Sequence, residues 1–138
     1  MKIDYIDSVE NICWETVSEI IDLVGWGKRS PEDVCLSFET SSYVIFAYHQ
    51  DKIVGFGRTV DDGKFYGLVV DLIVHPDHQS NGIGRFILKS LKNSLEGYSF
   101  TTLTSEVGKE GFYEKQGWKK QTRSFIWPRS EQQRKQFT

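Results

Sequence analysis

DLIVHPDHQSNGIGRFIL, residues 71 to 88, is the stretch of sequence that decides the fold. An apolar run from Leu68 to Val74 is stopped by His75-Pro76, and a polar loop then ends in Gly82-Ile83-Gly84 and opens into a helix. The first backbone N–H groups of a helix have no intrahelical partner, so together with the helix dipole they attract phosphates. Glycine lets the backbone approach a bulky ligand because it has no Cβ. We interpret this strand–loop–helix unit as a pyrophosphate cradle.

The composition limits the kind of protein to which the cradle belongs. A length of 138 residues, with 38% hydrophobic and 14% aromatic residues, predicts a single compact domain over residues 1–138 with a loose polar tail at 129–138. The net charge of −2 argues against nucleic-acid binding, which needs a basic face. No apolar run approaches the roughly 18 residues of a membrane span. The beginning, MKIDYIDSVE, does not resemble a signal peptide, so we expect a cytoplasmic protein without a membrane partner.

Cysteine and histidine usage predicts no metal site. Cys13 and Cys35 are far apart and lack ligand spacing, so we expect small buried apolar residues in a reducing compartment. His75 and His78 flank the loop and His49 ends a hairpin strand, and for all three we expect surface roles exposed to solvent.

Hydrophobic periodicity and turn signals predict alternating elements around the cradle. Ser8 and Ser30-Pro31 are expected to cap the first two helices, and Gln50-Asp51 and Asp62-Gly63 are expected to turn hairpins. The helix after the cradle is expected to be a crossover, which makes the next strand parallel to the one before it. The expected helices are 8–24, 30–38, 84–95 and 111–116, and the expected strands are 2–6, 43–49, 52–60, 64–74, 99–105, 118–121 and 122–127.

Two motifs in this order resemble those of the GNAT acetyltransferase superfamily. Gln79-Ser80-Asn81-Gly82-Ile83-Gly84 is similar to its acetyl-CoA motif, and Phe112 to Trp118, FYEKQGW, is similar to a second family feature around a tyrosine. The resemblance implies an α/β (α+β) GNAT fold. Such a fold has a mixed, mainly antiparallel sheet of six to seven strands, about four helices on both faces, and parallel, splayed strands 4 and 5.

Other interpretations of the glycines are weaker. A nucleotide-triphosphatase loop needs Lys-Ser or Lys-Thr after its last glycine, where this chain has Arg85-Phe86. A dinucleotide fingerprint needs a third glycine, where this chain has Ile87. A purely structural role, in which the glycines only allow a tight turn and close helix packing, remains an alternative to ligand binding.

The resemblance implies acetyl-CoA as cofactor and assigns its contacts. The pantetheine arm would pair with the backbone of Leu72, Ile73 and Val74. The pyrophosphate would take backbone N–H groups of the loop, with the Arg85 side chain near it. The loop residues are Gln79, Ser80, Asn81, Gly82, Ile83 and Gly84.

Catalysis requires a proton for the departing thiolate and a neutral amine. The resemblance places Tyr113 as the general acid that hydrogen-bonds to the thiolate, and a core tyrosine is the alternative. Asp71, inside an apolar strand, is a candidate base, although a structural carboxylate is at least as consistent with the pattern. Glu106 is the other candidate, at a position where many relatives carry Asn. A water chain without a dedicated base is the third.

The acceptor site is expected around Trp26, Arg29, Arg58 and Trp118, together with Glu106. The resemblance implies an N-acetyltransferase, and we expect it to act directly on a primary amine of a small molecule. A protein or peptide amine is the alternative acceptor, and a non-catalytic acyl-CoA-binding domain is the alternative function. Dimers are frequent in the family, so the resemblance also allows a homodimer.

Overall fold

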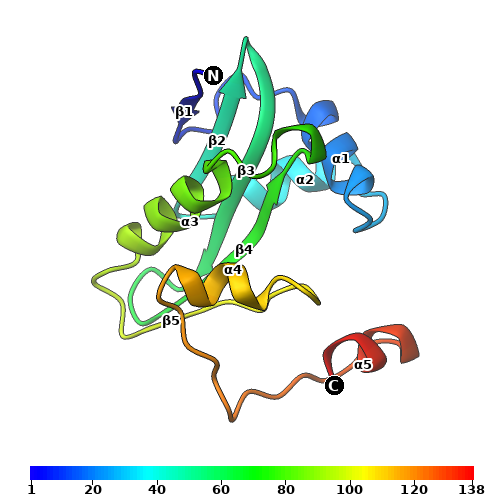
Figure 1. Cartoon of the computed structure of the whole chain (residues 1–138), viewed down its shortest axis with the longest axis vertical. Helices are drawn as coiled ribbons and strands as arrows, with labels where there is room; N and C mark the ends of the chain where they lie inside the picture. Colours follow the sequence, from blue (N-terminus) through cyan, green and yellow to red (C-terminus); the bar gives the residue numbers. More distant parts are fainter. The chain divides into compact units, whose positions relative to one another are not determined.

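The computed structural model describes all 138 residues, which divide into two compact units, Met1–Leu103 and Thr104–Thr138. The first unit contains a five-stranded sheet in the order β1-β2-β3-β4-β5 (Figure 1). Neighbours from β1 to β4 are antiparallel, and β5 is parallel to β4, as the crossover predicted. The strands are β1 (Asp4–Ile6), β2 (Val44–His49), β3 (Lys52–Asp61), β4 (Tyr66–Val74) and β5 (Phe100–Thr102).

Helices cover both faces of this sheet. On one face, α3 (Ile83–Ser94) lies against β3, and a Cβ on Gly57 would lie only 2.9 Å from Cγ2 of Ile87. On the other face, α1 (Trp14–Leu23) and α2 (Pro31–Glu39) close the main core. The rings of Phe38, Phe46 and Phe56 pack together there, with centroids 5.2 to 6.5 Å apart. Two core layers therefore hold β3 and β4 in place, and β4 leads directly into the cradle.

The second unit contains two short helices, α4 (Glu110–Lys115) and α5 (Glu131–Phe137). Tyr113 lies on α4, as expected from the FYEKQGW motif. Neither unit contains a helix long and apolar enough to cross a membrane.

The sheet is smaller than the six to seven strands that we expected. Residues 118–121 and 122–127 form no strands, and the sheet ends at β5. Strand propensity describes how a side chain packs on a half-buried sheet, and this segment has no such surface: Phe125 is 95% exposed and Trp127 is 80% exposed. The prediction of two closing strands is therefore wrong.

The expected loose tail is a helix with its own cap. The Ser130 side chain accepts a hydrogen bond from the backbone N–H of Gln133, and the Gln133 side chain accepts one from the backbone N–H of Arg129. Arg134 also forms an ion pair with Glu131. This reciprocal capping was readable in the sequence as Ser-x-x-Gln.

The first helix also begins later than expected. Ser8 bonds the backbone N–H of Glu10 in a local turn, and α1 starts after Cys13, which is exposed rather than buried. Cys35 is half-buried, and both cysteines are free. At α2 the expected cap is confirmed, since Ser30 accepts a hydrogen bond from the backbone N–H of Asp33.

Candidate active site

The loop between β4 and α3 has the geometry of an anion cradle. It contains η1 (Pro76–His78), and two of its residues, Ser80 and Gly82, adopt left-handed φ angles of 69° and 79°. Alternating backbone of this kind turns successive N–H groups toward one concavity. The backbone N–H groups from Gly82 to Arg85, at the start of α3, have no acceptor within the protein. The residues present therefore fit a pyrophosphate.

Side chains of the loop hold this shape. The Gln79 amide donates to the carbonyl oxygen of Val74 at 3.1 Å, which ties the loop to the end of β4. Asn81 donates to the carbonyl oxygens of His78 and Gln79. Arg85 is exposed, and its guanidinium lies 3.8 Å from where a Cβ on Gly82 would stand. A cation thus lies beside the free N–H groups.

The strand before the loop has an open edge. Pairing between β4 and β5 ends at Leu68 and Thr102, so from Val69 to Val74 this edge of β4 has no neighbouring strand. Extended backbone without a partner can pair with an extended ligand. Leu72, Ile73 and Val74, the residues expected to hold the pantetheine arm, lie on this edge.

A bulge in β4 precedes these residues. Phe56 pairs with Ile73 and Arg58 pairs with Val70, so Asp71 and Leu72 together oppose Gly57. Asp71 has a φ of 52°, which is rare for a residue other than glycine. A bulge re-aims side chains and bends its strand, and here it turns the Asp71 carboxylate toward Arg58.

Two arginines hold the Asp71 carboxylate. Nε of Arg58 donates to Oδ2 at 2.8 Å, and Nη1 of Arg29 donates to Oδ1 at 3.3 Å. Asp71 is 7% exposed, Arg58 15% and Arg29 39%. The structure therefore brings together three predicted site residues, which come from β4, β3 and the α1–α2 loop. Both carboxylate oxygens of Asp71 therefore already accept hydrogen bonds from arginine side chains.

Arg58 is further bound to α2 and the residues that follow it. Its Nη1 lies 3.4 Å from the carbonyl oxygen of Ser37 and 3.3 Å from Oγ of Ser41. Its guanidinium also lies over the Phe38 ring, 5.7 Å from the centroid. This side chain joins sheet and helix, and the sequence did not reveal these partners.

The histidines form a cluster beside the cradle instead of lying free at the surface. Nε2 of His78 lies 3.4 Å from Nδ1 of His49, and the His75 ring packs edge-on against His78. All three are half-buried, and Nδ1 of His78 is buried without a partner. The three side chains are only partly exposed because the β2–β3 hairpin end lies against η1. No group of three or more His, Cys, Asp or Glu side chains is placed to hold a metal.

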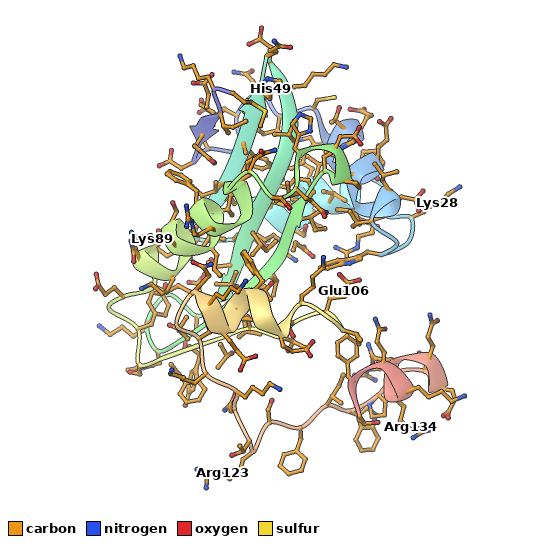
Figure 2. The ribbon with its side chains drawn as sticks, viewed as in Figure 1. Lys28, His49, Lys89, Glu106, Arg123 and Arg134 are labelled. Carbon is orange, nitrogen blue, oxygen red and sulfur yellow. The ribbon has the colours of Figure 1, made fainter.

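The remaining predicted residues form none of the hydrogen bonds of the Asp71 network. Trp26 is exposed in the α1–α2 loop, while Glu106, Tyr113 and Trp118 are half-buried in the second unit (Figure 2 labels Glu106). Burial, and then the negative charge of Glu106, raise the pKa of Tyr113 above its ordinary value. Both effects keep the phenol protonated, as a proton donor requires.

Comparisons with known proteins agree with this geometry. The family described as "Acetyltransferase (GNAT) domain" matches residues 24–127. An uncharacterized N-acetyltransferase ycf52 from Pyropia yezoensis is 31% identical over 119 residues, which are 82% of this chain and 68% of the relative. Serotonin N-acetyltransferase 2, chloroplastic, from Oryza sativa subsp. japonica is 30% identical over 103 residues, 70% of this chain and 52% of the relative.

Among solved structures, a GNAT-family acetyltransferase from Streptococcus pneumoniae superimposes with a TM-score of 0.79 at 27% identity and covers 94% of this chain and 100% of its own. The family match spans most of the chain and includes the cradle, the β4 bulge and Tyr113. The chain belongs to the GNAT family and is an acetyl-CoA-dependent N-acetyltransferase.

Proposed function

We propose that this enzyme transfers the acetyl group directly from acetyl-CoA to the primary amine of a small molecule. The observation that carries the proposal is the open edge of β4, which runs from the bulge at Asp71 directly into the cradle. Direct transfer needs the thioester to lie extended beside the acceptor, and this edge offers one continuous path for it. A small-molecule acceptor is supported by the relative whose name is serotonin N-acetyltransferase.

The cofactor contacts follow from the free groups in the cradle. The backbone N–H groups from Gln79 to Gly84 bind the pyrophosphate, and Arg85 adds a positive charge. The backbone of Leu72 to Val74 pairs with the pantetheine arm. Because backbone groups make most of these contacts, Ser80→Ala is expected to change affinity little.

Proton transfer is assigned to Tyr113 and Glu106. Acetyl-CoA supplies an activated thioester, and its thiolate leaving group needs a proton. Tyr113 provides that proton, since its raised pKa keeps the phenol neutral. Glu106, whose charge acts on Tyr113, accepts a proton from the acceptor ammonium, either directly or through water. Asp71 serves as a positioning residue for Arg29 and Arg58, because its oxygens are already occupied.

A panel of acceptors tests the proposed function. The rate of thiol release from acetyl-CoA would be measured with small primary amines and with lysine-containing and free N-terminal peptides. Small amines are expected to be acetylated with the higher kcat/KM. Turnover with peptides alone would assign a protein acceptor. Tight CoA binding without turnover on any amine, and no effect of Tyr113→Phe, would assign a non-catalytic acyl-CoA-binding domain.

A further inference from the structure

The network around Asp71 carries one more positive charge than negative charge. Arg29 and Arg58 both bond to the single carboxylate of Asp71. No other ion pair reaches either arginine, although Glu32 and Asp33 lie only a few residues from Arg29 in the chain. A cluster with one uncompensated positive charge attracts an anion.

The excess charge lies at Arg29. The Arg58 guanidinium is bound by Asp71, by Ser37 and Ser41, and by the face of Phe38. Arg29 uses only Nη1, so its Nε and Nη2 have no partner in the protein, and the side chain is 39% exposed. These free donors are available to a ligand from solvent.

Arg29 is also held in place before any ligand arrives. The Ser18 hydroxyl on α1 donates to the carbonyl oxygen of Arg29, which fixes the backbone, and Asp71 holds the guanidinium. A donor that is already ordered loses little conformational entropy when it binds. Arg29 therefore has the preorganisation of a binding residue, which a freely solvated surface arginine lacks.

The position of Arg29 connects it with the acceptor. Asp71, its partner, immediately precedes Leu72, where the proposed pantetheine path begins. Trp26, an exposed aromatic residue, lies in the same α1–α2 loop. A molecule bound at this loop would lie close to the reacting end of the thioester.

We infer that Arg29 is an anion subsite for the acceptor, and that the acceptor is an amine that also carries a carboxylate. The guanidinium fork matches a planar carboxylate and repels an acceptor with only positive charge, such as a polyamine. This inference rests on the proposed function, since it names the substrate class of the same site.

Matched pairs of acceptors test the inference. Each pair consists of an amino acid and its decarboxylated amine: tryptophan and tryptamine, phenylalanine and phenethylamine, arginine and agmatine. The aminophosphonate analogue of phenylalanine provides a phosphate-like anion. The carboxylated member of at least one pair is expected to have the lower KM. Arg29→Gln is expected to raise that KM about ten- to a hundredfold, the usual effect of losing a charge-assisted hydrogen bond, and to leave the KM of its amine unchanged.

Two further variants separate binding from structure. Lys28→Gln removes a neighbouring cation that makes no ion pair and that points away from the sheet in Figure 2, so it is expected to leave both KM values unchanged. Arg29→Lys keeps the charge and is expected to recover part of the affinity. If Arg29→Gln raises the KM of both members of a pair equally, the role of Arg29 is merely structural. If Lys28→Gln raises the KM of the carboxylated acceptor as much as Arg29→Gln does, the attraction is non-specific. Either result overturns the inference.

The other possible outcomes also support or overturn the carboxylate subsite. A lower KM for the decarboxylated amines, or for the phosphonate, would overturn the carboxylate assignment. If no amine is acetylated, the proposed function fails, and calorimetric titration of the same compounds into the CoA-loaded protein decides the subsite. Carboxylate binding that Arg29→Gln abolishes would support the subsite even then, and no binding would overturn it.

Discussion

Asp71 is buried between two guanidinium groups, so loss of its charge leaves Arg58 without a counter-ion inside the fold. Removing one partner of a buried ion pair costs about 3 to 5 kcal/mol. We therefore expect Asp71→Asn to lower the free energy of unfolding by an amount of this order, measured by urea denaturation. The exposed Asp51, which forms no ion pair, provides the control Asp51→Asn. Equal stability of Asp71→Asn and the wild-type protein would contradict a stabilising role of this buried ion pair.

Tyr113 gives the prediction that concerns proton transfer. Tyr113→Phe removes the hydroxyl but keeps the ring that packs on Phe112, so kcat is expected to fall 10²- to 10⁴-fold while acetyl-CoA affinity changes little. The pKa of Tyr113 is raised, and the acid form exists below that pKa. Its deprotonation should therefore reduce wild-type activity only as the pH rises past about 10, the reference value. An unchanged rate in Tyr113→Phe would remove the assignment.

At the scale of elements, Gly57 sets the distance between β3 and α3. A Cβ there would lie 2.9 Å from Ile87 and 3.0 Å from Leu91, both buried. Overpacking of this kind costs about 1 to 3 kcal/mol, so we expect Gly57→Ala to lower the thermal midpoint of unfolding by several degrees. Gly97→Ala is the matched control, because nothing lies within 4 Å of its added Cβ. Equal midpoints for the two variants would contradict close packing at Gly57.

Local signals in the sequence predicted most elements of the sheet unit. The cap at Ser30, the turns at Gln50-Asp51 and Asp62-Gly63, and the parallel β5 all depend on short-range geometry or on chain connectivity. The prediction of two closing strands was wrong because the residue pattern of 118–127 does not reveal whether a sheet edge is available for them to pair with. The prediction that Ser8 caps the first helix was wrong because a serine side chain can stabilise a local turn as well as a helix start.

The same distinction between local and long-range signals applies to the candidate active site. The cradle could be predicted because its chemistry lies in consecutive residues, from Gln79 to Arg85. The ion pairs of Asp71 join residues 42 and 13 positions apart, and they depend on the strand register and on a bulge that the sequence does not reveal. The contact between His49 and His78, 29 positions apart, was missed for the same reason.

At the scale of the whole molecule, stability is distributed unevenly between the two units. Every buried residue of the apolar core lies before Leu103, while the second unit exposes Val107, Phe125 and Trp127. Segments with few buried contacts open at low free energy and exchange their amide hydrogens quickly. In the free enzyme we therefore expect fast hydrogen exchange over residues 104–138 and slow exchange in β3, β4 and α3.

Hydrogen exchange measured with and without CoA tests the proposed cofactor contacts at the cradle and around Tyr113. Binding of CoA would satisfy the free N–H groups at the start of α3, so peptides covering Gln79 to Phe86 are expected to gain protection. If Tyr113 hydrogen-bonds to the thiol end of CoA, α4 is ordered by the same ligand, and peptides covering Glu110–Lys115 are expected to gain protection as well. The Lys89 to Ser94 end of α3 lies beyond the proposed contacts and is the internal control. Protection of the cradle without protection of α4 would leave pyrophosphate binding intact and would separate Tyr113 from the reacting thioester.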